Sequence, residues 1–145
     1  MLARNIMKTD VVTVSPSASV AEAAHVMRDE GIGALVVTDD ERKPVGIVTD
    51  RDIVVSNIAD HQNPDEMLVE GLMDKKLANR KLITVNEDAD VFEILRVLSK
   101  HSIRRVPVTK SGRLVGIVSV DDIVVIVATK LTNLASALSS PSKVV

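Results

Sequence analysis

Apolar side chains follow one order along the chain, a helix pattern and then two strand-like runs, and this order occurs twice. Spacings of i, i+3, i+4 and i+7 bury one face of a helix. These spacings are formed by Val20, Ala23, Ala24 and Met27, and again by Val91, Ile94, Leu95 and Leu98. Short apolar runs then predict strands at 34–38 and 45–48, and at 105–109 and 114–118. With a short strand ending near Val14 or Val85 and a second helix after each strand pair, the pattern predicts two βαββα units.

The second unit repeats the first in sequence as well as in pattern. GIVTDRDI, which starts at Gly46, returns as GIVSVDDI, which starts at Gly116, a spacing of 70 residues. Internal repeats of this kind indicate units that bury a shared core. We therefore assign residues 1–62 to a first repeat, 63–138 to a second repeat and 139–145 to a disordered tail.

Polar residues mark the expected helix starts. Ser19 with Glu22, and Asp90 with Glu93, fit an N-cap residue paired with a glutamate three positions later. The polar connector between the repeats holds Asn63-Pro64, which predicts a further short helix because proline favours the first helical position.

The last helix is expected over 120–138 and is longer than its counterpart in the first repeat. Residues 123–128 are apolar around its whole circumference, and a helix of this kind is normally buried. One small repeat is too small to cover it, so we expect this helix at a subunit interface. Burial between the repeats of a single chain is the alternative.

One polar motif, Gly-apolar-apolar-Thr/Ser-x-x-Asp, stands where a strand meets the last helix of each unit. It is formed by Gly46, Thr49 and Asp52, and by Gly116, Ser119 and Asp122. A helix start offers unpaired N–H groups to a phosphate, a hydroxyl adds a hydrogen bond, and a carboxylate one turn in accepts both hydroxyl protons of a ribose. We interpret the glycine as allowing a ligand to approach the backbone. The alternative is that the motif is only a helix cap, with aspartate in the place of glutamate.

Composition narrows the class of protein. Apolar residues make up 46% of the chain, enough for a core, but Phe92 is the only aromatic residue. The missing aromatic platforms and the net charge of −2 disfavour nucleic-acid binding. The chain has no cysteine, its three histidines lie far apart, and no nucleophile–base pair or phosphate loop is found, so we expect neither a metal site nor an enzyme. No signal peptide is visible and the longest apolar run is too short to cross a bilayer, so a cytoplasmic chain without membrane contact is expected.

Residues 3–130 resemble a tandem pair of CBS domains. The resemblance rests on IMKTDVVTV, GIGALVV and GIVTDRDI in the first repeat, and on LMDKK, ITV, SIRRVPV and GIVSVDDI in the second. It implies an α/β (α+β) fold in which two βαββα units pack sheet to sheet about a pseudo-twofold axis. It also implies a regulatory module that binds AMP, ADP, ATP or S-adenosylmethionine between its repeats. Such modules often form a homodimer, a flat disc of four repeats.

The resemblance also implies nucleotide-binding roles for single residues. Asp52 and Asp122 would hold the ribose, and Thr49 and Ser119 would help to hold phosphate. The backbone near Val14 and Val85, with Val36 and Pro107 beside it, would enclose the adenine.

The two sites are expected to be unequal. Arg104 and Arg105 precede a strand of the second repeat, where the first repeat has Gly33 and Ala34. Arginine forms paired hydrogen bonds with phosphate oxygens, so we expect at least one of the two to contact phosphate. Lys8 and His101 are further candidates for the cleft, although we favour an ordinary surface position for each.

The sequence therefore predicts a sensor that needs no cofactor and takes an adenosine-type molecule as its regulatory ligand. Ligand binding would change the surface shown to an unidentified regulated protein. The alternative is a ligand-free dimerisation module that acts through protein–protein contacts.

Overall fold

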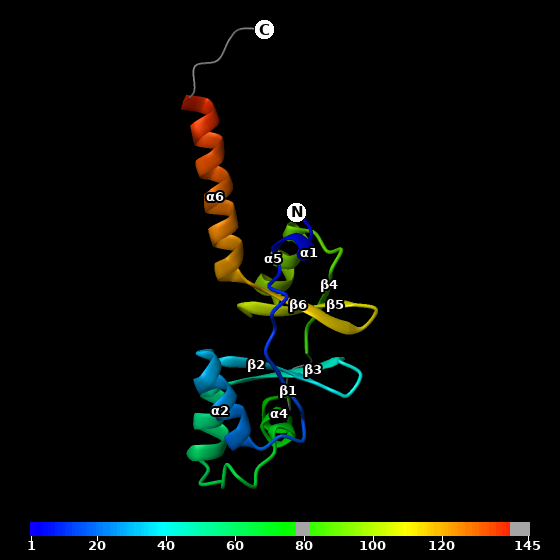
Figure 1. The fold of residues 1–145 in the computed structure, drawn as a ribbon, viewed down its shortest axis with the longest axis vertical. Helices are drawn as coiled ribbons and strands as arrows, with labels where there is room; N and C mark the ends of the chain where they lie inside the picture. The colour runs from blue at the N-terminus through cyan, green and yellow to red at the C-terminus, as the bar shows by residue number, and fades with distance from the viewer. Residues whose placement is uncertain (78–81, 140–145) are drawn as a thin grey trace.

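The protein, seen in a computed structural model that describes residues 1–77 and 82–139, consists of two similar units whose sheets face each other (Figure 1). The first sheet contains β1 (Thr13–Val14), β2 (Ala34–Thr38) and β3 (Pro44–Thr49), in that order. The second sheet contains β4 (Val85–Asn86), β5 (Arg105–Lys110) and β6 (Arg113–Ser119), in that order. The predicted mixed fold of two βαββα repeats, packed sheet to sheet, is confirmed.

Helices cover the outer face of each sheet. The first unit has α2 (Val20–Glu30) and α3 (Asp50–Ile53), which continues as the π-helical segment η1 (Val54–Ile58). The second unit has α5 (Val91–Lys100) and α6 (Val120–Ser139). Two further helices, α1 (Ala3–Ile6) and α4 (Val69–Leu77), precede the repeats.

The two sheets share one register. β1 lies parallel to β2, which lies antiparallel to β3 with Val36 opposite Ile47. The second sheet has the same arrangement, with Pro107 opposite Ile117. Because alternate residues of a strand face opposite sides of a sheet, Val48 is fully buried in the core of its own unit while Ile47 faces the other unit.

The helix that precedes each repeat packs in the core of the other repeat. In α1, Ala3 and Ile6 join the core cluster of the second unit, and the Ala3 N–H donates to the Ala89 carbonyl at 2.8 Å. In α4, Leu72 and Met73 join the core cluster of the first unit. The predicted ranges 1–62 and 63–138 therefore follow the sequence repeat, whereas each folded core draws one helix from the other half of the chain.

This exchange explains the two motif glycines. A Cβ atom on Gly116 would lie 2.5 Å from Met7 Sδ and 2.9 Å from the Lys8 carbonyl oxygen. A Cβ atom on Gly46 would lie 2.8 Å from Met73 Cε. Both glycines make room for the chain that crosses from the other half. The interpretation that they admit a ligand is wrong, because methionine side chains fill that space.

The expected caps of the first pair of helices are confirmed, but the connector differs from the prediction. Ser19 Oγ accepts the Glu22 N–H at 3.0 Å, and Asp90 Oδ1 accepts the Glu93 N–H at 2.9 Å. No helix starts at Pro64: the Met67 N–H donates to the Asn63 carbonyl at 2.9 Å in a turn. Leu68 then pairs with Ser19 as an isolated bridge, so the chain must extend before α4 begins at Val69.

Helix α6 confirms the predicted range within one residue and points away from the body of the protein (Figure 1). Ile123 is its only buried residue, while Val124 and Leu131 are 59% and 61% exposed. The alternative of burial within a single chain is therefore wrong. By length and composition α6 is also the one described helix that could cross a membrane.

Candidate functional site

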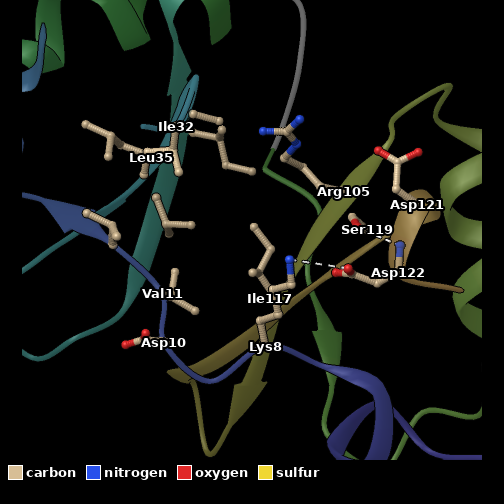
Figure 2. Close-up of a pocket in the computed structure, with 14 residues that line it drawn as sticks. Lys8, Asp10, Val11, Ile32, Leu35, Arg105, Ile117, Ser119, Asp121 and Asp122 are labelled. Atoms are coloured by element: carbon tan, nitrogen blue, oxygen red, sulfur yellow. Dashed lines mark hydrogen bonds and ion pairs between the residues drawn. The ribbon is translucent and has the colours of Figure 1, made fainter. Parts of the chain in front are cut away.

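A cavity of about 270 Å³ lies between the two units, where the N-terminal segment crosses from one unit to the other (Figures 1 and 2). Its apolar lining consists of Val11, Val12, Ile32, Ala34, Leu35, Val36 and Ile47 of the first repeat, with Ile117 of the second. Its polar lining consists of Lys8 and Asp10 of the crossing segment, with Arg105, Ser119, Asp121 and Asp122 of the second repeat. An apolar wall with a few convergent polar groups is typical of small-molecule sites.

The start of α6 supplies the centre of the polar side. Ser119 Oγ accepts the Asp122 N–H at 3.1 Å, so Ser119 caps the helix. The Asp122 carboxylate lines the cavity, and its Oδ1 lies 3.4 Å from Lys8 Nζ. Figure 2 shows these two side chains pointing toward each other. Lys8, which we interpreted from the sequence as ordinary surface, therefore lies at the candidate site.

The equivalent motif of the first repeat closes on itself. Thr49 Oγ1 accepts the Asp52 N–H at 3.2 Å, and Asp52 Oδ2 accepts the Thr49 N–H at 2.8 Å. This is a complete capping box. Thr49 and Asp52 do not line the cavity. The helix-cap alternative thus describes the geometry of this motif, whereas in the second repeat the carboxylate faces a cavity.

The two arginines are placed differently. Arg105 lines the cavity from the first residue of β5. Arg104 does not line it, and its Nη2 lies 3.0 Å from Asp121 Oδ1 in a largely exposed pair. Arg105 is therefore the arginine in position to meet an anionic ligand.

The predicted apolar residues separate in the same way. Val36 lines the cavity, but Val14, Val85 and Pro107 do not, although all three are buried. Val14 and Val85 belong to the core clusters of their own units. Their predicted role at the adenine stays a prediction, like that of Asp52 at the ribose and that of Thr49 at the phosphate.

Sequence reasoning missed most of the apolar wall. Ile47 and Ile117 alternate with the core residues Val48 and Val118, and that alternation placed them on the inner face of a sheet covered on both sides. The sequence contained this signal, because a strand that is covered on both sides carries apolar residues on both of its faces. Asp10 and Lys8 carried no such signal, since their place depends on how the first segment crosses.

Two stretches of the chain, residues 3–56 and 72–129, match the CBS domain family. Hypoxic response protein 1 of Mycobacterium tuberculosis is 37% identical over 121 residues, which cover 83% of this chain and 81% of that protein. An uncharacterized protein of Methanopyrus kandleri is 36% identical over 119 residues, and this chain spans only 58% of its length.

Solved structures agree with these matches. The structure of Hypoxic Response Protein I with two coordinated zinc ions has a TM-score of 0.76 at 35% identity, covering 86% of this chain and 97% of that one. The CBS domain pair of protein MJ0100, in complex with 5′-methylthioadenosine and S-adenosyl-L-methionine, has a TM-score of 0.71 at 29% identity. That comparison covers 90% of this chain and 98% of the other.

Proposed function

Because this chain belongs to the CBS domain family, we propose that it is a regulatory module that binds an adenosine-containing ligand in the cavity between its repeats. The observation that carries the proposal is the placement of Ser119, Asp122 and Arg105 opposite an apolar wall. The ligand is AMP, ADP, ATP or S-adenosylmethionine. The MJ0100 pair, which holds two adenosine-containing molecules, supports this class of ligand.

Each part of the cavity suits one part of such a ligand. Val36, Ile47 and Ile117 offer apolar surface to the two faces of a purine. The Asp122 carboxylate can accept hydrogen bonds from the hydroxyls of a ribose. Arg105 offers a planar set of donors that matches a phosphate or a carboxylate.

An organic ligand fits the donor set better than a metal ion does. The mycobacterial relative coordinates zinc, but in the part of this chain that the structure describes no group of three or more His, Asp or Glu side chains could hold a metal ion. In this proposal the ligand is regulatory and the chain needs no cofactor.

The two predicted sites are unequal in this proposal. The cavity beside Asp122 is the main site, since Thr49 and Asp52 already satisfy each other. A second, weaker site in the first repeat would use Asp52, with Val14, Val85 and Pro107 near the base.

Regulation would act through another protein. A ligand that contacts both repeats favours the arrangement to which it binds more tightly, and this changes the surface shown to a partner. We propose that the chain is a cytoplasmic homodimer without catalytic activity of its own. The exposed apolar residues of α6 support the dimer.

A thermal-shift panel with AMP, ADP, ATP and S-adenosylmethionine tests the proposal. A ligand present at 100 times its Kd adds about 2.7 kcal/mol of stability, which corresponds to a rise in Tm of roughly 5–10 °C in a chain of this size. We expect Asp122→Ala to lose the response of the main site and Asp52→Ala, whose carboxylate does not line the cavity, to keep the response of that site. A chain that shows no shift with any of the four at millimolar concentration contradicts the proposal.

The exposed face of α6 also favours a second candidate, a ligand-free dimerisation module. This candidate predicts that the chain forms a dimer and that no ligand of the panel raises its Tm.

A further inference from the structure

The Asp122 carboxylate, which the proposed ligand would use, forms an ion pair with Lys8. The backbone holds Lys8 at the cavity, because its N–H and carbonyl both bond to Ile117 of β6, each at 2.9 Å. The Lys8 side chain is 70% exposed and that of Asp122 only 23%, so the ammonium group reaches in from the solvent side. In Figure 2 a dashed line joins this ammonium group to the Asp122 carboxylate.

The charges around the cavity balance only because of Lys8. Asp10, Asp121 and Asp122 face Lys8 and Arg105, and Arg104 neutralises Asp121 from outside. Without Lys8, Asp10 and Asp122 would outnumber Arg105. A cavity with a surplus of carboxylates repels a phosphate, whereas an uncharged ligand is little affected.

The residue that follows the covering methionine differs between the repeats. Met7 covers Gly116 and Met73 covers Gly46, and these methionines are followed by Lys8 and Asp74. Lys8 lies beyond the end of α1, in an extended segment that bridges to Ile117, whereas Asp74 lies within α4. The extended backbone after α1 is what brings Lys8 to the cavity.

We infer that Lys8 sets the charge preference of the cavity. In this structure it pairs with Asp122. In the complex it turns to a phosphate of the ligand and leaves the Asp122 carboxylate to the ribose, so that phosphate-bearing nucleosides bind better than uncharged ones. The inference rests on the proposed function and deepens it.

Calorimetric titration of the full chain with AMP and with 5′-methylthioadenosine tests this inference. Loss of a hydrogen bond to a charged group weakens binding roughly tenfold to a hundredfold, so we expect Lys8→Met to lose that much affinity for AMP. The same variant keeps its affinity for 5′-methylthioadenosine or gains at most about fivefold, because an exposed ion pair competes only weakly. Lys8→Arg keeps the preference for AMP.

Lys110→Met is the matched control. Lys110 is 67% exposed and lies 3.6 Å from Glu87 Oε1, so the variant removes a similar ion pair outside the cavity. The variant should change the affinity for neither ligand. If Lys8→Met changes the affinity for both ligands equally, or changes neither affinity, the role of Lys8 is overturned. The proposed function is then unaffected. A wild-type chain that binds neither ligand overturns this inference. If ADP, ATP and S-adenosylmethionine also fail to bind, the proposed function is overturned as well.

Discussion

At the scale of single residues, one motif has two uses in the same chain. The Asp52 carboxylate accepts a hydrogen bond from the N–H of its own helix cap, while Asp122 pairs across a cavity with Lys8. The motif residues Thr49 and Ser119 both cap a helix. The role of the motif aspartate therefore depends more on its neighbours in the folded structure than on the residue types of the motif.

Thr49→Ala should destabilise the fold without affecting the main site. The substitution removes the hydroxyl that caps α3, which costs about 1 kcal/mol of the free energy of unfolding. Urea unfolding followed by circular dichroism measures this loss, since the chain has no tryptophan. A tenfold loss of ligand affinity in this variant would place Thr49 at the main site instead.

The two motif glycines should differ in their tolerance of alanine. At Gly116 an added Cβ meets the Lys8 backbone as well as Met7, and backbone cannot move aside easily. At Gly46 it meets only the flexible end of Met73. We expect Gly116→Ala to cost about 2 kcal/mol and Gly46→Ala less than about 1 kcal/mol, because overpacking costs depend on how readily the neighbours shift. If urea unfolding shows equal losses of unfolding free energy for the two variants, the segment at Met7 and Lys8 is not rigid.

Residue-level roles were predictable from sequence where they are local. The caps at Ser19 and Asp90 involve residues three positions apart, and the sequence reveals both partners. Among the predicted binding residues, Val36, Arg105, Ser119 and Asp122 do line one cavity. Lys8 was only a candidate for the cleft, and its pairing with Asp122 was not predictable, because the two residues lie far apart along the chain.

At the scale of elements, α6 presents a continuous apolar stripe that is exposed from Val124 onward. Spacings of four and three alternate along Val120, Val124, Val127, Leu131, Leu134 and Leu138. This is the spacing at which a helix packs against a second helix in a coiled coil. Every member after Val120 is exposed. The predicted subunit interface therefore has a defined face.

Leu131→Lys with Leu134→Lys should convert the proposed dimer to a monomer with the fold intact, because neither side chain belongs to a core cluster. Sedimentation measures the mass and circular dichroism the helix content. Asn133→Lys with Ser136→Lys adds the same charge away from the stripe and should leave the dimer unchanged. A wild-type chain that is monomeric in buffer and sediments with lipid vesicles would assign this face to a membrane instead.

At the scale of the whole molecule, the exchanged helices make the two repeats one folding unit. Each core is completed by α1 or α4 from the other half of the chain. Small domains that lose part of their core rarely remain folded. The repeats are therefore not independent domains, although their sequences are separable.

Fragments 1–62 and 63–139 should each be largely unfolded alone, and the full chain should unfold in a single urea transition. The first fragment lacks Val69, Leu72 and Met73, and the second lacks Ala3 and Ile6. Circular dichroism of each fragment and of their mixture measures this. Two resolved transitions in the full chain, or a folded fragment, would contradict the coupling.

The sequence predicted the repeat and the strand ranges, because periodicity and repetition are properties of the chain itself. The sheet-to-sheet packing was predicted by the resemblance to CBS domains. It did not predict the exchange. Ile6-Met7 and Leu72-Met73 are alike, so neither shows which sheet it covers. The polar side of the cavity was not predictable for the same reason, since the crossing segment completes it.

The placement of α1 also has a consequence for synthesis. Ala3 is translated before its partner, because it packs only when the chain near Ala89 and the strands of the second sheet have followed. At translation rates of roughly 5–20 residues per second, the nascent α1 segment waits for seconds with its apolar side chains in water. A segment translated later thus completes the packing of an earlier one, and a ribosome that stalls between the two holds a product in which α1 has no core to join.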